Sequence, residues 1–327
     1  MKWSSLIALL LGLAVAVALA LANNVAAIGR TLALAGWGVG AVVVAHFPGT
    51  FFAARGWRSV IDEPLRPKVA RLFKFRWIKE AVNALLPVAQ VGGEFARARL
   101  LIRDGASLRG AAASCTVDAA AGVTGLFLYT LLGLAFFVVA PHDAAAAELA
   151  GRGVMVGGAI AIVVALAPRL GLLRLIEGGL KRLGAGKAWV GLGDIGGLHE
   201  AVMALYRQPA KLWSCTGWHL LSWMAGTLET YVALTVLGLH PTVAEAFIID
   251  SLGQGIRAAG FAVPGALGVQ EGGYILVCGL FGIPPDKALA FSFIRRIREL
   301  ILGVPGLAVW AKMEGWTLKG VLSRKPA

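Results

Sequence analysis

The chain has 327 residues, of which 58% are hydrophobic and 15% charged, and its mean hydropathy is +0.75. Soluble domains carry about 25% charged and 45–50% apolar residues, so this composition argues against a water-soluble enzyme, a disordered chain and a disulfide scaffold. Lys and Arg outnumber Asp and Glu by 31 to 18, a net charge of +13. We predict an all-α polytopic membrane protein with a single membrane domain (residues 1–327). We expect its excess positive charge to lie in cytoplasmic loops and not to bind nucleic acid.

Six stretches have the length and apolar character of membrane spans, for which about 20 residues are needed. They are residues 3–22, 36–53, 111–140, 153–168, 212–238 and 288–310. The first resembles a signal peptide, but its apolar run is long and only one lysine precedes it. We therefore predict an uncleaved anchor, with a cleaved signal peptide as the alternative.

Basic residues follow spans two, four and six, whereas the other connections hold almost none. They are Arg55, Arg58, Arg66, Lys68, Arg71, Lys74, Arg76, Arg97, Arg99, Arg103 and Arg109, then Arg169, Arg174, Lys181, Arg182, Lys187, Arg207 and Lys211, then Lys312, Lys319, Arg324 and Lys325. By the positive-inside rule we predict that the N- and C-termini are both cytoplasmic. The linker 169–211 is expected to be cytoplasmic, with an interfacial helix or a solvated connector at 170–183. Arg97, Arg99 and Arg103 are expected to snorkel to the cytoplasmic surface.

Two apolar stretches are interrupted by proline and glycine and carry charges. They are residues 76–101, RWIKEAVNALLPVAQVGGEFARARLL, and residues 246–282, AFIIDSLGQGIRAAGFAVPGALGVQEGGYILVCGLFG. Each is too broken for a simple span and too apolar for a loop. The predicted break residues are Pro87, Gly92, Gly93, Pro264, Gly265 and Gly268.

The two broken stretches align with one offset. Pro87 and Glu94 are seven residues apart, as are Pro264 and Glu271, and 264 − 87 gives an offset of 177. Applied without gaps, this offset places span two on span five and span three on span six. The halves, roughly 36–140 and 213–317, have opposite predicted orientations. We therefore predict an inverted repeat in which two re-entrant helical hairpins enter the bilayer from opposite faces.

Charged side chains in apolar helices cost about 2.5–3.5 kcal/mol each on insertion scales, so those found there are candidate functional residues. Several occur at helical spacing, such as Asp250, Gln254 and Arg257. We predict a substrate route along these residues, with structural ion pairing as the alternative. The predicted set is Glu80, Asn83, Gln90, Glu94, Arg97, Asp250, Gln254, Arg257, Gln270, Glu271, Arg295, Arg298 and Glu299. Asp118 maps onto Arg295, so these two are candidates to pair across the repeat axis. Glu229 stands alone in span five, with structural and functional roles both open.

Enzyme chemistry has little support in the sequence. The five histidines are scattered and the three cysteines show no C-x-x-C spacing, so we predict no metal site. The glycine-rich segment 184–197 lacks the spacing of a phosphate loop. We therefore expect no cofactor and no catalytic residue.

The broken stretches resemble a known family. Residues 77–101 and 250–273, together with FIRRIREL at 293–300, resemble the two signatures of the membrane region of lysylphosphatidylglycerol synthases and related flippase-like proteins. The segments PVAQVGGE and VPGALGVQEG are similar to the corresponding segments in the branch of this family that is found with hopanoid-biosynthesis genes. The resemblance covers nearly the whole chain and implies movement of lipids between leaflets. The residues that match motif positions are Glu94, Arg97, Arg257, Glu271, Arg295 and Arg298.

The resemblance implies a lipid transporter and not a synthase. Lysylphosphatidylglycerol synthases carry a soluble aminoacyl-transfer domain after the membrane part, and this sequence ends at Ala327, soon after span six. We expect a flippase-like protein with a central polar cavity, for which membrane lipids are the partners and lipid-biosynthesis enzymes are further candidates. The alternatives are a membrane-embedded lipid-modifying transferase or its non-catalytic partner, and an ion or small-solute carrier.

Overall fold

The computed structural model describes residues 29–30, 32–33, 35–61, 66–86, 92–139, 197–260 and 263–314, apart from the side chains of Val139 and Pro264. Helices and no strands occur in these ranges, which confirms the predicted all-α class. Several sequence predictions lie outside the described residues: spans 3–22 and 153–168, the segment 170–183, Pro87 and Gln90.

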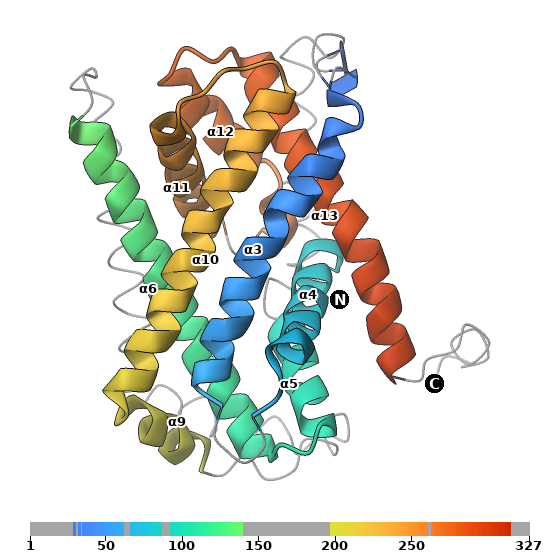
Figure 1. Ribbon diagram of the computed structural model, residues 1–327, viewed down its shortest axis with the longest axis vertical. Helices are drawn as coiled ribbons and strands as arrows, with labels where there is room; N and C mark the ends of the chain where they lie inside the picture. Colours follow the sequence, from blue (N-terminus) through green and yellow to red (C-terminus); the bar gives the residue numbers. More distant parts are fainter. Residues whose placement is uncertain are drawn as a thin grey trace.

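Two sets of helices follow one another in the same order (Figure 1). The first set is α3 (Gly38–Ser59), α4 (Val69–Leu85), α5 (Gly92–Arg103) and α6 (Leu108–Val139). The second set is α10 (Pro209–Val236), α11 (Val243–Ala259), α12 (Val269–Gly279) and α13 (Pro285–Glu314). The short helix α9 (Leu198–Tyr206) precedes α10, and the 3-10 helix η2 (Pro264–Ala266) lies between α11 and α12. Each set therefore consists of a long helix, a broken pair of helices and a second long helix.

The helix bounds repeat along the chain. The last residues of α3 and α10, the first residues of α5 and α12, and the first residues of α6 and α13 are each 177 positions apart. Both ends of α4 and α11 are 174 positions apart (243 − 69 and 259 − 85), so the second break is three residues longer than the first. The gap-free alignment of the sequence is therefore wrong by three residues across α4 and α11.

The two broken pairs lie at opposite ends of the molecule. Figure 1 shows α4 and α5 in its lower half and α11 and α12 in its upper half. α3 packs along α10 at the centre, α4 packs against α13, and α11 packs against α6. The first helix of each broken pair thus packs on the last long helix of the other half.

Small residues allow the helices of the two halves to approach closely. A Cβ atom on Gly306 of α13 would lie 2.7 Å from the Cβ of Ala81 on α4. A Cβ atom on Gly133 of α6 would overlap the Ser251 side chain on α11. Small side chains at such crossings are typical of packing between membrane helices, where close backbone contact replaces the hydrophobic driving force.

α4 begins earlier than the sequence analysis predicts. Arg71, Lys74 and Arg76, which we assigned to a loop, lie on this helix. The reason is an amphipathic period: Leu72, Phe75 and Ile78 are buried on one face while the basic residues lie between them. A count of positive charges alone hides this pattern.

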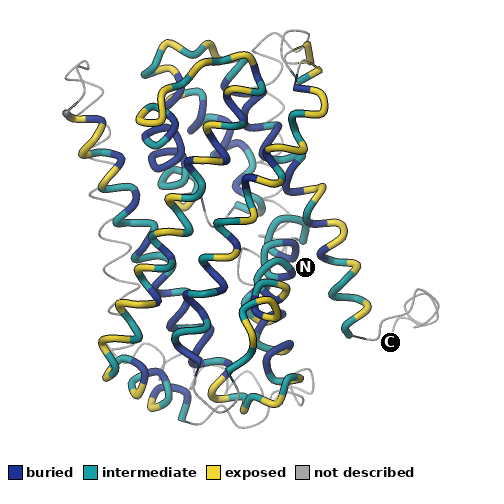
Figure 2. The backbone as a smooth tube through the Cα atoms, viewed as in Figure 1, coloured by how far each residue is buried: buried dark blue, intermediate teal, exposed yellow. Residues whose placement is uncertain are grey.

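Apolar side chains are exposed along the outside of the long helices. α10 exposes Trp213, Leu221, Met224, Leu228 and Tyr231, and Figure 2 shows exposed positions recurring along its length. Within the described ranges one helix, Leu108–Val138 in α6, is long and apolar enough to cross a membrane by length and composition. The charged residues in the middle of α13 are buried or half-buried: Arg295, Arg296, Arg298 and Glu299.

Candidate functional site

A first network of buried charges lies between the α4–α5 pair and α6. It consists of Arg76, Lys79, Glu94, Arg97 and Asp118. Asp118 is fully buried on α6; its Oδ2 accepts a hydrogen bond from Arg97 Nη1 at 2.5 Å and lies 3.5 Å from Arg76 Nη1. The Glu94 carboxylate joins Arg97 Nε, at 2.6 Å, to Lys79 Nζ, at 2.5 Å. The network thus holds both helices of the pair against α6.

Arg97 does not reach the surface, so the prediction that it snorkels is wrong. Its side chain is 0% exposed and stacks 4.6 Å above the Trp57 ring. Arg99 and Arg103 are 66% and 48% exposed and pair with Glu314 at the end of α13. The helical period explains the difference, since Arg97 shares the buried face of α5 and the other two arginines do not.

A second network lies between α10, α11 and α13 and consists of Glu229, Asp250, Arg295 and Arg298. Arg295 Nη1 donates to Asp250 Oδ1 at 2.6 Å. Glu229 Oε1 lies 3.0 Å from Arg298 Nη2 and 3.6 Å from Arg295 Nε. All four side chains are nearly or fully buried. Glu229, which stands alone in the sequence, is therefore the anion that two arginines share.

A third network surrounds the break between α11 and α12 and consists of Arg257, Glu271, Arg296 and Glu299. Glu299 on α13 accepts from Arg257 at 2.8 Å and from Arg296 at 3.3 Å. Glu271 accepts from Arg296 at 3.2 Å and from the Gly268 backbone N–H at 2.7 Å. These contacts fix the irregular backbone of the break to α13.

A histidine connects the first network to the second. His46 on α3 lies 3.2 Å from Glu80 Oε2 through Nε2 and 2.8 Å from Glu229 Oε2 through Nδ1. Glu80 in turn accepts from Arg76 Nε at 3.2 Å. Glu80, His46 and Glu229 are called the histidine bridge below. Through this bridge, a continuous series of polar contacts runs from one half of the repeat to the other.

The two halves contain equivalent ion pairs with the charges exchanged. Arg76 and Asp250 are 174 positions apart, and Asp118 and Arg295 are 177 apart, the offsets of their helices. In the first half the base is on α4 and the acid on α6; in the second the acid is on α11 and the base on α13. Asp118 and Arg295 do not meet as we anticipated, because each pairs within its own network.

The remaining predicted residues have simpler surroundings. Asn83 Oδ1 accepts from the Gly93 N–H at 2.8 Å and so closes the first break. Gln270 Nε2 donates to Ser292 Oγ at 3.0 Å, and Gln254 is half-buried on α11. In the second break, Gly265 and Gly268 have φ angles of 64° and 79°, which glycine adopts without strain.

Replacement of Gly93 with alanine is expected to lower the free energy of unfolding by about 1–3 kcal/mol, because overpacking forces the backbone apart. A Cβ atom there would overlap the Lys79 carbonyl oxygen on α4, so α5 must move away. SDS titration in mixed micelles measures the loss. Gly279→Ala on α12, which has open space around it, is the matched control. Equal stability of both variants would contradict the close α4–α5 approach.

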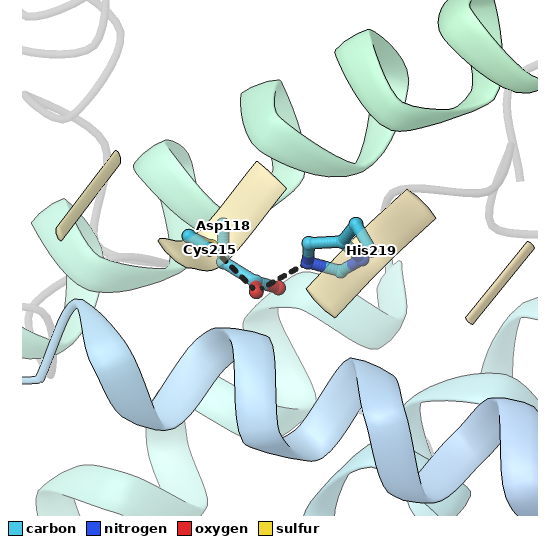
Figure 3. Close-up of side chains that lie close together, drawn as sticks. All are labelled: Asp118, Cys215 and His219. Atoms are coloured by element: carbon cyan, nitrogen blue, oxygen red, sulfur yellow. Dashed lines mark hydrogen bonds and ion pairs between the residues drawn. The ribbon is translucent and has the colours of Figure 1, made fainter. Parts of the chain in front are cut away.

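Three potential metal ligands lie together beside the first network (Figure 3). His219 Nε2 is 2.7 Å and Cys215 Sγ 3.7 Å from Asp118 Oδ1. Residue spacing did not indicate this cluster. However, Arg97 occupies the other Asp118 oxygen, and a divalent cation at the carboxylate would lie beside that guanidinium. The contacts therefore describe a hydrogen-bonded cluster, and we assign no metal to it.

Comparison with known proteins places the chain in a family. A family model described as the lysylphosphatidylglycerol synthase TM region matches residues 5–306. The chain belongs to this family. The resemblance inferred from the two broken stretches is thereby confirmed. No curated protein and no solved structure matches the chain.

Membership of the lysylphosphatidylglycerol synthase TM region family makes this a membrane protein involved in lipid metabolism. The networks also contain residues that were absent from the predicted site set: His46, Arg76, Lys79, Asp118, Glu229 and Arg296. The corrected offset of 174 pairs Arg76 with Asp250 and would have identified it. His46 carries no such signal, since nothing in the sequence shows that two distant carboxylates meet at one ring.

Proposed function

We propose that this protein moves a lipid between the leaflets of a bacterial inner membrane. In this proposal the α4–α5 and α11–α12 pairs are re-entrant hairpins that enter from opposite faces, and both termini are cytoplasmic. Hopanoids are the candidate lipid because the sequences PVAQVGGE and VPGALGVQEG resemble the branch of the family found with hopanoid-biosynthesis genes. The protein acts as a carrier and not as an enzyme.

The observation that carries the proposal is the buried charge between the two hairpins. Within the described ranges the three networks and the histidine bridge hold seven basic and seven acidic residues. They are Arg76, Lys79, Arg97, Arg257, Arg295, Arg296 and Arg298, with Glu80, Glu94, Asp118, Glu229, Asp250, Glu271 and Glu299. Insertion of each charged residue at a helix centre costs about 2.5–3.5 kcal/mol of free energy. So many charges are therefore poorly explained by structural pairing of helices alone.

The balance of charges indicates how a headgroup would bind. Because each acid already faces a base, a polar headgroup enters by replacing one partner of an internal ion pair. Among the residues of the networks, three buried atoms make no hydrogen bond, although Glu229 Oε1 and Arg295 Nε are in ion-pair contact: Glu229 Oε1, Arg295 Nε and Arg298 Nε. Exchange of a partner should cost least there. All three belong to the second network, next to the histidine bridge. Inverted repeats with broken helices place transporter sites at this position between the halves.

Loss of leaflet transfer in two variants tests the proposal. Glu271→Gln and Arg257→Ala are each expected to reduce transfer at least roughly tenfold, since each removes a charged hydrogen bond at the second break. The assay follows a fluorescent lipid in reconstituted vesicles by dithionite quenching. Lys68→Ala, an exposed charge at the start of α4, is the control. Wild-type rates in both folded variants would overturn the assignment of the second break to the lipid route. Covalent modification of a labelled hopanoid or polyprenyl acceptor by pure protein would instead show a transferase.

A further inference from the structure

The histidine bridge contains two hydrogen bonds that a neutral histidine cannot make together. Both ring nitrogens of His46 face carboxylate oxygens, of Glu80 at 3.2 Å and of Glu229 at 2.8 Å. A neutral imidazole has one N–H donor and one acceptor nitrogen, and an ionised carboxylate only accepts. With both carboxylates ionised, one ring nitrogen would present a lone pair to another lone pair. The observed geometry therefore requires one additional proton, on the ring or on one carboxyl group.

We infer that the histidine bridge binds one exchangeable proton and that this proton is the coupling ion for transport. The inference rests on the proposed lipid transfer and adds its energy source. His46 lies on α3, Glu80 on α4 and Glu229 on α10, and α3 packs against both of the other helices (Figure 1). The proton thus joins the first hairpin to the second half of the repeat.

Release of the proton leaves only one of the two hydrogen bonds. The shorter bond to Glu229 is retained, because this carboxylate is only 3% exposed and would otherwise be buried without its donor. Glu80 is 31% exposed, so water can take over its bond to the ring, and the proton enters and leaves at this side. Deprotonation therefore removes the link through His46 between Glu80 on α4 and Glu229 on α10, while Thr50 still donates to Glu80 from α3. This loosens the first hairpin from the second half of the repeat.

The other groups at the bridge keep its remaining charges paired in both states. Arg76 on α4 holds the second oxygen of Glu80 at 3.2 Å, and Thr50 on α3 donates to the first at 3.2 Å. Arg298 and Arg295 on α13 face the second oxygen of Glu229 at 3.0 and 3.6 Å. Each carboxylate retains a cationic neighbour, so the proton alone decides whether the ring joins them.

Transport under a pH gradient tests the inference. The full chain is reconstituted into vesicles of phosphatidylethanolamine and phosphatidylglycerol with a trace of NBD-labelled phosphatidylglycerol, and valinomycin with equal potassium clamps the membrane potential. With one proton per cycle, a gradient of about one pH unit sustains a roughly tenfold enrichment of the label in one leaflet. His46→Gln is expected to abolish the enrichment, and His240→Gln, an exposed histidine, to preserve it. Gradient-driven enrichment in His46→Gln, or label movement in wild type that ignores the gradient, would overturn the inference.

A second variant guards against misfolding of His46→Gln. The amide of Glu80→Gln can donate to a neutral ring, so the packing is kept without the additional proton. This variant should fold as the wild type does and lose the enrichment. Persistence of the enrichment would count against the bridge as the proton site.

Histidine NMR separates this inference from the proposed function. In protein with ¹⁵N-labelled histidine, the His46 ring, which is hydrogen-bonded at both nitrogens, should give its own signal at neutral pH. This signal should change on alkaline titration and be absent from His46→Gln. If the signal is present but the label never moves in wild type, the proton site stands and lipid transfer fails. If the His46 signal is unchanged between neutral and alkaline pH, the bridge exchanges no proton and the inference fails whatever the vesicles show.

Discussion

Replacement of Arg295 with methionine is expected to lower the free energy of unfolding by about 3–5 kcal/mol, the cost of leaving a buried charge without its partner. Among the described residues Arg295 is the cation in ion-pair contact with Asp250, and both side chains are almost fully buried. Methionine has a similar length and fills the space, so the loss reports charge and not volume. After the change, Asp250 keeps hydrogen bonds only from the uncharged Tyr129 and Thr230.

SDS titration in mixed micelles, followed by tryptophan fluorescence, measures this loss. Lys312→Met on the same helix is the matched control, since Lys312 is exposed near the end of α13. The control should change stability by no more than about 0.5 kcal/mol. A comparable effect of both variants would mean that the Arg295–Asp250 pair contributes no specific stability.

Much of the fold could be predicted from the sequence because apolar length is a strong local signal. The stretches 36–53, 111–140, 212–238 and 288–310 lie on α3, α6, α10 and α13, with ends that differ by up to six residues. The break at Pro264 separates α11 from α12 as expected, because proline opposes helix continuation. Gly92 and Gly93, which were predicted as break residues, instead form the start of α5. The start of α4 was not predicted, because its basic residues have the composition expected of a cytoplasmic loop.

The site was less predictable, because partners depend on distances between helices that are far apart in sequence. Helical spacing correctly grouped Asp250 with Arg257 on α11, yet they join different networks on α13. Arg97 was assigned to the surface from its position near other arginines, and only the turn of α5 buries it. Glu229 and His46 have no charged neighbours along the chain, so only the packing of α3 against α10 reveals their contact.

Replacement of Arg97 with methionine is expected to cost a similar amount, about 3–5 kcal/mol, and a second change should return part of it. Arg97 and Asp118 are both completely buried and in direct contact. Removing Arg97 alone leaves Asp118 facing the more distant Arg76 at 3.5 Å. Removing both, with Asp118→Leu, eliminates the uncompensated charge.

The double variant should therefore lose less stability than the sum of the single losses, with a coupling energy of about 2–3 kcal/mol. The charges that remain keep partners, because Glu94 retains Lys79 at 2.5 Å and Arg76 retains Glu80 at 3.2 Å. Additive losses would show that the network distributes the Asp118 charge over Arg76 and His219, so that no single pair dominates. Strong coupling would show that the first network, like the Arg295–Asp250 pair in the second half, is built around one buried pair. Asp118 and Arg295, which occupy equivalent positions of the repeat, would then each depend on one dominant partner.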